Sequence, residues 1–290
     1  MDIRRLEVFL AVVDDGSFTG AADVLEISQP AVSQAVAALE RELGARLFHR
    51  LGRSVRLTDA GVALCAPARL ALRDIAAARE AVGAVHDLLA GHLELACLPT
   101  LAVSPLAPIV GTFRREFPAV TISLLDPDDT SDVLGLVRSG RCELGIVGDV
   151  LDTDLELVAM TTQAYRVLLP PGTGASRTIG VEELAAMPIV APPRGSSSRD
   201  LLDEVLARAG QLATVVVETA QREALVPLVL AGAGAALVPD SLADIGERLG
   251  CEVAAMHPDV GRAVSIVHRR STLTPAAAAF VRLAVSQSGR

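Results

Sequence analysis

The chain has 290 residues, of which 51% are hydrophobic, and a mean hydropathy of +0.43. This composition predicts folded units with buried cores and excludes an intrinsically disordered protein. The chain contains no lysine. Its 26 arginines face 35 acidic residues, so the net charge is −9. A chain this acidic does not suit contact with a polyanion over its whole surface, and any nucleic-acid contact has to be local.

The charge is unevenly distributed along the sequence. Residues 1–58 contain seven arginines and eight acids, a balance of −1, whereas residues 59–290 contain 19 arginines and 27 acids, a balance of −8. Between positions 41 and 56, five arginines face the lone acid Glu42. Because salt screens charges beyond about 10 Å, this basic patch can attract phosphate despite the acidic remainder.

Cysteine and histidine spacing gives no sign of a metal site. The chain has four widely spaced cysteines: Cys65, Cys97, Cys142 and Cys251. We expect them to be reduced and mostly buried, with no metal, no cofactor and no enzymatic activity. Asp2 and Glu7 fall where a signal peptide needs an apolar core, and proline or glycine interrupts the uncharged runs 95–113 and 225–239. A cytoplasmic protein without a membrane span is expected.

The first 58 residues predict three helices and a hairpin. Residues 3–14 have the apolar spacing of an amphipathic helix, and residues 50–58, with Gly52 at the tip, suit a short hairpin. Glycines mark the helix ends and serines mark the starts: Gly16 and Gly44 end the first and third helices, and Ser17 and Ser28 cap the second and third. This order is typical of a helix-turn-helix followed by a wing.

Residues 59–89 predict a long helix with a heptad seam. The seam positions step by four and three: Leu64, Ala68, Ala71, Ile75, Ala78, Val82, Val85 and Leu89. Such spacing favours pairing with a second helix, and hence dimerisation. The alternative is an ordinary amphipathic helix that packs on its own domain. Pro67 is expected to kink the helix or to mark a joint.

From Gly91 onward, apolar strands alternate with helical stretches. The expected strands are 92–97, 120–125, 143–147, 165–169, 188–191, 214–218 and 235–238. The expected helices are 103–117, 130–139, 196–209 and 221–231. This alternation predicts an α/β fold with parallel sheets, and a junction near 148–162 predicts two lobes with a cleft between them.

The third helix offers side chains suited to reading DNA. Gln29, Ser33 and Gln34 share its outer face, and a glutamine amide matches the donor and acceptor of adenine in the major groove. Pro30 is placed to contact a thymine methyl group. Arginines of the wing can enter a narrow minor groove.

Three consecutive serines begin the helix expected at 196–209. Hydroxyls, free N–H groups and the positive end of the helix suit a carboxylate. A simple cap needs only one serine, and here Ser196, Ser197 and Ser198 stand together. Thr100 follows the first strand, at the edge where open α/β sheets bind ligands. Arg194 or Arg199 is a candidate counter-charge for such an acid, and each can equally be a surface residue.

The sequence resembles the LysR-type transcriptional regulators over essentially its whole length. The densest match comprises Gly16, Ser17, Phe18, Thr19, Ala21, Ala22, Leu25, Ser28, Gln29, Pro30, Ser33, Leu39, Glu40, Leu43, Gly44, Leu47, Phe48, Arg50, Arg53, Leu57, Thr58, Ala60 and Gly61. A looser match continues through FRREFP, ELGIV, PPRGSSSR, AGAGAALVP and TPAAAAFVRL. Gly20, Ala37 and Ala38 depart from the more polar residues frequent in the family, so we expect fewer phosphate contacts and more dependence on the wing.

The resemblance implies three regions. Residues 1–58 form a winged helix-turn-helix, residues 59–90 form a linker helix used for dimerisation, and residues 91–290 form an effector domain like the type 2 periplasmic binding proteins. Lobe 1 of that domain is expected at about 91–161 and 267–290, and lobe 2 at about 162–266. The expected DNA contacts are Ser17, Thr19, Ser28, Gln29, Pro30, Ser33, Gln34, Arg50, Arg53 and Arg56. The expected effector contacts are Thr100, Thr130, Gly148, Ser196, Ser197, Ser198 and Thr219.

The resemblance also implies partners: promoter DNA, a small-molecule effector, RNA polymerase, and further copies of the chain that assemble as dimers into a tetramer. Our hypothesis is that a small organic acid closes the cleft and thereby changes the spacing of the DNA-reading heads. A redox-sensing regulator is the main alternative, with Cys97 and Cys142 approaching each other in lobe 1. A solute-binding protein without a regulatory role is disfavoured, because such a protein would need export.

Overall fold

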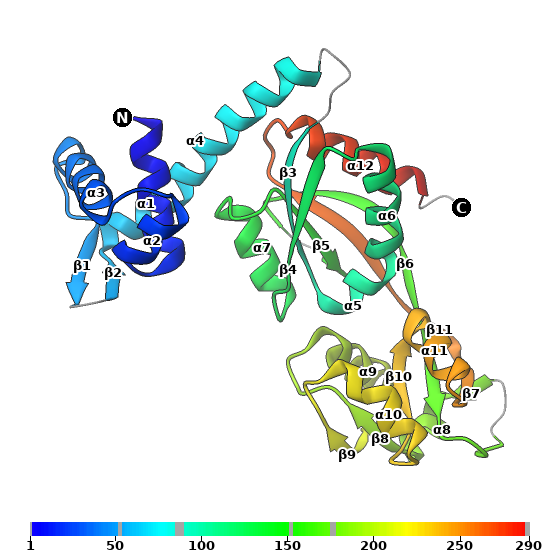
Figure 1. Ribbon diagram of the computed structural model, residues 1–290. Coiled ribbons are helices and arrows are strands. Elements are labelled where there is room, and N and C mark those ends of the chain that lie inside the picture. Colours follow the sequence, from blue (N-terminus) through cyan, green and yellow to red (C-terminus); the bar gives the residue numbers. More distant parts are fainter. Residues whose placement is uncertain (1, 52–53, 85–89, 151–152, 175–177, 288–290) are drawn as a thin grey trace.

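A computed structural model describes residues 2–51, 54–84, 90–150, 153–174 and 178–287. Figure 1 shows a small N-terminal head, a long helix that leaves it, and a larger C-terminal part made of two bodies. We call the elements between Ile3 and Leu57 the head. No helix in the described residues is long and apolar enough to cross a membrane.

The head contains three helices and a two-stranded hairpin: α1 (Ile3–Asp15), α2 (Phe18–Val24), α3 (Gln29–Leu43), β1 (Phe48–Leu51) and β2 (Ser54–Leu57). The expected helix boundaries are confirmed. The Ser17 hydroxyl accepts a hydrogen bond from the Gly20 N–H, and the Ser28 hydroxyl accepts one from the Ala31 N–H. Gly16 and Gly44 end α1 and α3 in the left-handed conformation, which glycine adopts without steric cost.

Helix α4 (Asp59–Ala84) follows the hairpin and continues through Pro67. The first half of its heptad seam meets the head of the same chain. Ala68 is buried in the head, and Leu64 and Ala71 pack against the same core. This half therefore packs on its own domain, as the alternative interpretation expects. Val85 and Leu89 lie outside the described residues.

Lobe 1 is built on three parallel strands: β3 (Gly91–Cys97), β4 (Val120–Leu125) and β5 (Leu144–Gly148). The lobe also contains α5 (Pro99–Leu101), η1 (Ala102–Leu106), α6 (Ala107–Glu116), α7 (Thr130–Arg138) and α12 (Pro275–Gln287). The expected helix 103–117 is interrupted, since Ser104 has extended backbone angles and the regular helix begins at Ala107.

Two long strands join the lobes: β6 (Glu156–Leu169) and β11 (Glu252–His268). They pair with each other antiparallel and contribute to the cores of both lobes. The parallel pairing expected from the sequence is present among β3, β4 and β5, but the sheet is mixed, because β11 also runs antiparallel to β5, and β10 (Ala236–Pro239) runs antiparallel to β6. The expected junction at 148–162 overlaps β6, which begins at Glu156.

Lobe 2 completes the domain around the far halves of β6 and β11. Its elements are β7 (Thr178–Gly180), α8 (Val181–Ala186), β8 (Pro188–Ala191), α9 (Ser197–Arg208), β9 (Thr214–Glu218), η2 (Arg222–Ala224), α10 (Leu225–Leu230), β10 and α11 (Asp240–Arg248). The expected helix 221–231 is one 3-10 turn followed by α10. Figure 1 shows lobes 1 and 2 joined by the long strands, with α9 and α10 in lobe 2.

Candidate DNA interface and effector site

Helix α3 separates its buried and exposed faces cleanly. Val32, Val36 and Leu39 are buried in the head, whereas Gln29 and Gln34 are exposed. The Gln29 side-chain amide donates a 2.9 Å hydrogen bond to the hydroxyl of Ser33, one turn further along. This bond holds the Gln29 amide and the Ser33 hydroxyl together, so a DNA base that binds either group would have to replace it.

The remaining expected DNA contacts surround the start of α3 and the wing. Pro30 is exposed, and Ser28 is exposed while it caps α3. Ser17 is half-buried, caps α2, and donates its hydroxyl proton to Asp15; Thr19 is exposed.

The wing is only partly described. Arg56 is exposed on β2, opposite His49 of β1. The backbone of Arg50 belongs to β1, and Arg53 lies outside the described residues.

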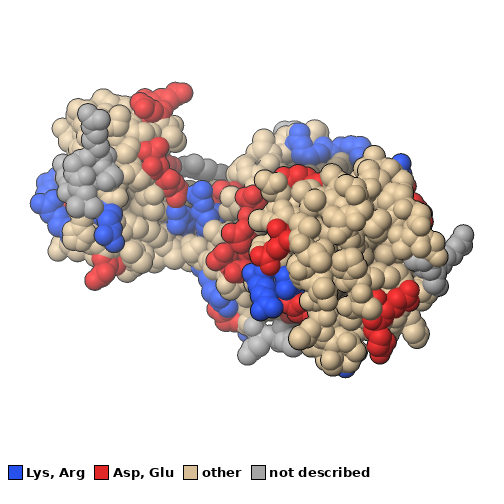
Figure 2. Space-filling view, turned by 90° about the horizontal axis from the view of Figure 1, so that it is seen from below, with Lys and Arg blue, Asp and Glu red and all other residues tan. Residues whose placement is uncertain are grey.

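A charged junction connects the head, α4 and the effector domain. The Asp14 carboxylate of α1 accepts hydrogen bonds from Arg69 of α4 and from Arg141, which precedes β5, the latter at 2.8 Å. Nearby, Arg73 of α4 donates to the carbonyls of Gly140 and Cys142 at 2.7 and 2.9 Å. Figure 2 shows acidic and basic side chains gathered where the smaller body meets the larger one.

The residues just before β5 therefore contact α4, and the other end of β5, at Gly148, lies beside Arg262 between the lobes. There Arg262 of β11 is only 3% exposed, yet its charged side chain bonds to both lobes. Its guanidinium donates to the Thr100 hydroxyl of lobe 1 at 2.6 Å and to the Ser197 hydroxyl of lobe 2 at 3.1 Å. A third bond goes to the Gln163 side-chain oxygen of β6 at 3.0 Å.

The surroundings hold Arg262 in this position. The Gln163 amide nitrogen donates to the carbonyls of Thr100 and Ser104, so its oxygen must face Arg262. The Tyr165 ring lies 5.6 Å from the guanidinium carbon. At Gly148, an added Cβ would come within 2.8 Å of the Arg262 side chain, so the glycine leaves room for the arginine to pass.

A cavity of about 370 Å³ lies beside Thr100 between the lobes. Apolar residues make up much of its lining: Pro99, Val103, Ala220, Pro239 and Leu242. Arg222, Glu223 and Ser241 add polar groups. The cavity sits where β3 and β10 end, the edge at which ligands bind in open α/β sheets.

The three serines differ in role. Ser196 precedes α9 and donates to the Pro193 carbonyl, Ser197 accepts from Arg262, and Ser198 is buried with its hydroxyl 3.5 Å from that of Tyr165. Thr130 is the first residue of α7, capped by Asp129. Thr219 follows β9 and accepts from the Gln221 N–H.

The arginine between the lobes is neither of the two candidates from the sequence. Arg194 is exposed. Arg199 is buried, but it already pairs with Asp203 at 3.0 Å and with Glu218 at 3.4 Å. Sequence reasoning missed both Arg262 and Gln163; the available signal was a polar residue in an otherwise alternating strand pattern, which by itself does not indicate a shared site.

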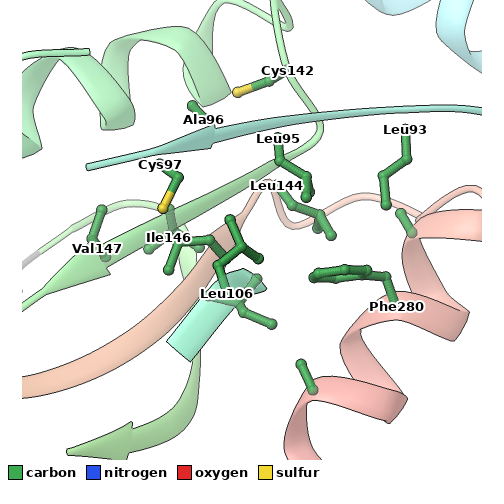
Figure 3. Packing of buried hydrophobic residues seen from close by; sticks show 14 of the residues in the cluster. Leu93, Leu95, Ala96, Cys97, Leu106, Cys142, Leu144, Ile146, Val147 and Phe280 are labelled. Atoms are coloured by element: carbon green, nitrogen blue, oxygen red, sulfur yellow. The ribbon is translucent and has the colours of Figure 1, made fainter. Parts of the chain in front are cut away.

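Cys97 and Cys142 do not approach each other as the redox alternative requires. Figure 3 shows them on opposite sides of β3. The Cys142 thiol lies against the backbone of Ala96 on one side of β3 and Cys97 lies on the other side, so the strand separates the two sulfurs (Figure 3). Burial raises the pKa of each thiol to about 12, so neither is a ready nucleophile. Among the described residues, no group of His, Cys, Asp or Glu could hold a metal ion.

The chain matches two known domain families. Residues 3–62 match the bacterial regulatory helix-turn-helix protein, lysR family, and residues 86–288 match the LysR substrate binding domain. The HTH-type transcriptional regulator IlvR of Caulobacter vibrioides is 31% identical, over 100% of this chain and 99% of that protein. The nitrogen assimilation regulatory protein nac of Escherichia coli is 32% identical, over 99% of this chain and 95% of that protein.

Solved structures agree in fold. Full-length OxyR from Pseudomonas aeruginosa has a TM-score of 0.80 at 24% identity, with 99% of this chain and 95% of that chain covered. Full-length CbnR, complexed with its target DNA, has a TM-score of 0.70 at 24% identity, with 99% and 100% covered. The head and the two-lobed domain occur in the same order as the two family matches. The chain therefore belongs to the LysR family of transcriptional regulators, with a helix-turn-helix DNA-binding domain and an effector-binding domain.

Proposed function

We propose that this regulator binds promoter DNA through the exposed face of α3 and the β1–β2 wing, and that a small organic acid between the lobes controls it. The observation that carries the effector half is the cavity beside Thr100, at the carboxyl ends of β3 and β10. For the DNA half, the exposed amides of Gln29 and Gln34 match the donor and acceptor groups of adenine, and Ser33 suits several bases.

Assembly through α4 supports the DNA half of the proposal. Residues 1–58 have a net charge of −1, so one copy would bind DNA weakly, and two linked copies would add their contacts. Because Leu64, Ala68 and Ala71 pack on the head, we place the dimer contact on the later part of the helix, from Ile75 onward. Two such dimers forming a tetramer would bring four heads to one promoter, where the regulator would act on RNA polymerase.

The path from effector to DNA follows β5. This strand begins beside the Arg73 and Arg141 contacts to α4 and α1, and it ends at Gly148 beside Arg262. An acid that binds one arrangement of the lobes more tightly would shift the protein toward that arrangement. The altered position of the heads would then change the spacing and bend of the bound DNA.

Footprinting tests the proposal on the full-length protein. The DNA upstream of the regulator's own gene is the probe, with and without acids that raise the melting temperature of the protein. We expect two protected half-sites separated by a whole number of helical turns, each about 10 bp, and a change in the protected region when acid is present. An identical footprint with a demonstrably bound acid would contradict the coupling, and no protection of this probe at any protein concentration would contradict the DNA half.

A further inference from the structure

We infer that Arg262 is the carboxylate receptor of the effector cleft, and that the effector is a compact aliphatic monocarboxylate. This inference rests on the proposed function, because it assigns a ligand class and a recognition residue to the same cleft. The first observation is how the two buried arginines, Arg199 and Arg262, are paired.

Arg262 is a buried cation without an acidic partner in the described part of the chain. Its hydrogen bonds go to three neutral oxygens, those of Thr100, Ser197 and Gln163. Arg199, equally buried in the same domain, has two carboxylates. Because an opposite charge offsets the cost of burying an ion better than neutral groups do, Arg262 has a stronger attraction for an anion from outside than Arg199 has.

Further donors lie beside the guanidinium. Ser197 and Ser198 are the first residues of the 12-residue helix α9, so their N–H groups have no carbonyl partner within the helix. Among the hydrogen bonds of the described residues, neither N–H has an acceptor. A carboxylate near Ser197 would therefore meet the guanidinium, free N–H groups and the positive end of α9 together.

The same arginine braces the cleft. Its bonds to Thr100 in lobe 1 and Ser197 in lobe 2 tie the lobes together through neutral groups. A carboxylate offers stronger, charge-assisted acceptors for the same N–H groups, so it would replace at least one arm of the brace. The contact between the lobes would then pass through the ligand, which gives the acid a means of preferring one lobe arrangement.

The neighbouring cavity sets the rest of the ligand. Thr100 contacts Arg262 and also lines the cavity, so the carboxylate and the body of the ligand meet at this residue. The apolar lining, with no aromatic side chain, suits an aliphatic body, and about 370 Å³ suits a small one. Arg222 and Glu223 bring opposite charges to the lining, so the cavity gives a second carboxylate no net attraction.

Isobutyrate and its neutral isostere isobutyramide provide the direct test, with binding to the full-length protein measured by titration calorimetry. We expect isobutyrate to bind the wild type and isobutyramide to bind at least about tenfold more weakly, because the charge-assisted bonds are lost. Arg262→Met should lose isobutyrate binding, and Arg262→Lys should keep part of it. Arg194→Met, the same change at an exposed arginine before α9, is the matched control and should bind like the wild type.

The melting temperature measured without ligand distinguishes an arginine that binds the effector from one that mainly stabilises the fold. Arg262→Met removes a buried charge together with three hydrogen bonds to neutral groups, so its melting temperature should fall less than that of Arg199→Met. Arg199→Met should melt lower, because it leaves Asp203 and Glu218 without their partner.

Three results would overturn the inference: Arg262→Met binding isobutyrate as the wild type does, Arg262→Met melting below Arg199→Met, or succinate or benzoate binding in place of isobutyrate. The last would leave the proposed organic-acid effector intact. If the wild type bound only neutral metabolites and no carboxylate, both the Arg262 inference and the proposed organic-acid effector would be wrong.

Discussion

The head and the effector cleft build their candidate sites in opposite ways. In the head, Gln29 and Gln34 of α3 are exposed and lie within two turns of one helix, with Gln29 bonded to Ser33. In the cleft, the central side chain is buried and its partners come from distant parts of the chain, since Arg262 and Thr100 are 162 positions apart. The geometry of a site on one helix is set mainly by that helix, whereas a site formed by helices and strands from distant parts of the chain depends on how all of them pack.

The largest effect that would sharpen this comparison is expected in the head. Gln29→Ala removes an amide able to make two hydrogen bonds to adenine, which is worth about 1–3 kcal/mol of discrimination between bases. Specific DNA affinity should fall accordingly, with acid binding and melting temperature unchanged, as measured by fluorescence anisotropy on operator and scrambled DNA. Gln211→Ala, remote from α3, is the control. An equal loss on both DNAs would mean that Gln29 only supports phosphate contacts.

The next effect concerns the cleft. Gly148→Ala places a Cβ where the Arg262 side chain passes, at 2.8 Å, so the guanidinium must move away from Thr100 and Ser197. Acid affinity should fall about tenfold, or about 1.4 kcal/mol, while DNA affinity without acid stays the same. Gly135→Ala, in α7, is the control because its Cβ meets nothing within 4 Å. Unchanged acid affinity for Gly148→Ala would show that acid binding does not depend on the exact position of the Arg262 guanidinium.

A smaller effect tests whether the two regions communicate. Arg141→Gln removes the bond from the effector domain to Asp14 of the head. Because this pair is partly exposed, we expect at most about 1 kcal/mol of lost stability. We expect the acid-dependent change in DNA affinity to shrink, while each ligand alone binds normally. Arg138→Gln breaks the exposed pair with Asp154 within the effector domain, so it serves as the control. If acid changed DNA affinity equally in Arg141→Gln and Arg138→Gln, the Arg141–Asp14 contact would not carry the signal from the cleft to the head.

The smallest expected effect concerns the cysteines. With pKa values raised to about 12 by burial, Cys97 and Cys142 are protonated at neutral pH, so iodoacetamide should not label them in the native protein. The double variant Cys97→Ser, Cys142→Ser should keep the acid response. Unfolded thiols ionise near 9, so the contribution of these thiols to the free energy of unfolding is complete below that pH and is lost as the pH rises toward 12. Peroxide-dependent DNA binding that is abolished in the double variant would favour a redox regulator.

Local signals explain why the head was predictable. A serine before a helix and a glycine after it act through hydrogen bonds only a few residues long, so Ser17, Ser28, Gly16 and Gly44 could be assigned from the sequence. The heptad pattern of α4 was less decisive. Periodicity identifies an apolar face, but it does not say whether that face meets another copy of the chain or, as at Ala68, the head of the same one.

The sequence by itself determined the helix-turn-helix with its wing, the α/β character of the remainder and the family, because these depend on short-range periodicity, capping and motif. Only the tertiary structure decided that β11 runs antiparallel through both lobes and that Arg262 lies between Thr100 and Ser197, bonded to neutral oxygens. The physical reason is that an arginine's pairing depends on which distant elements pack around it. Local spacing can indicate the pairing of Arg199 with Asp203, four residues later in the same helix, but nothing near Arg262 in the sequence indicates its neutral partners.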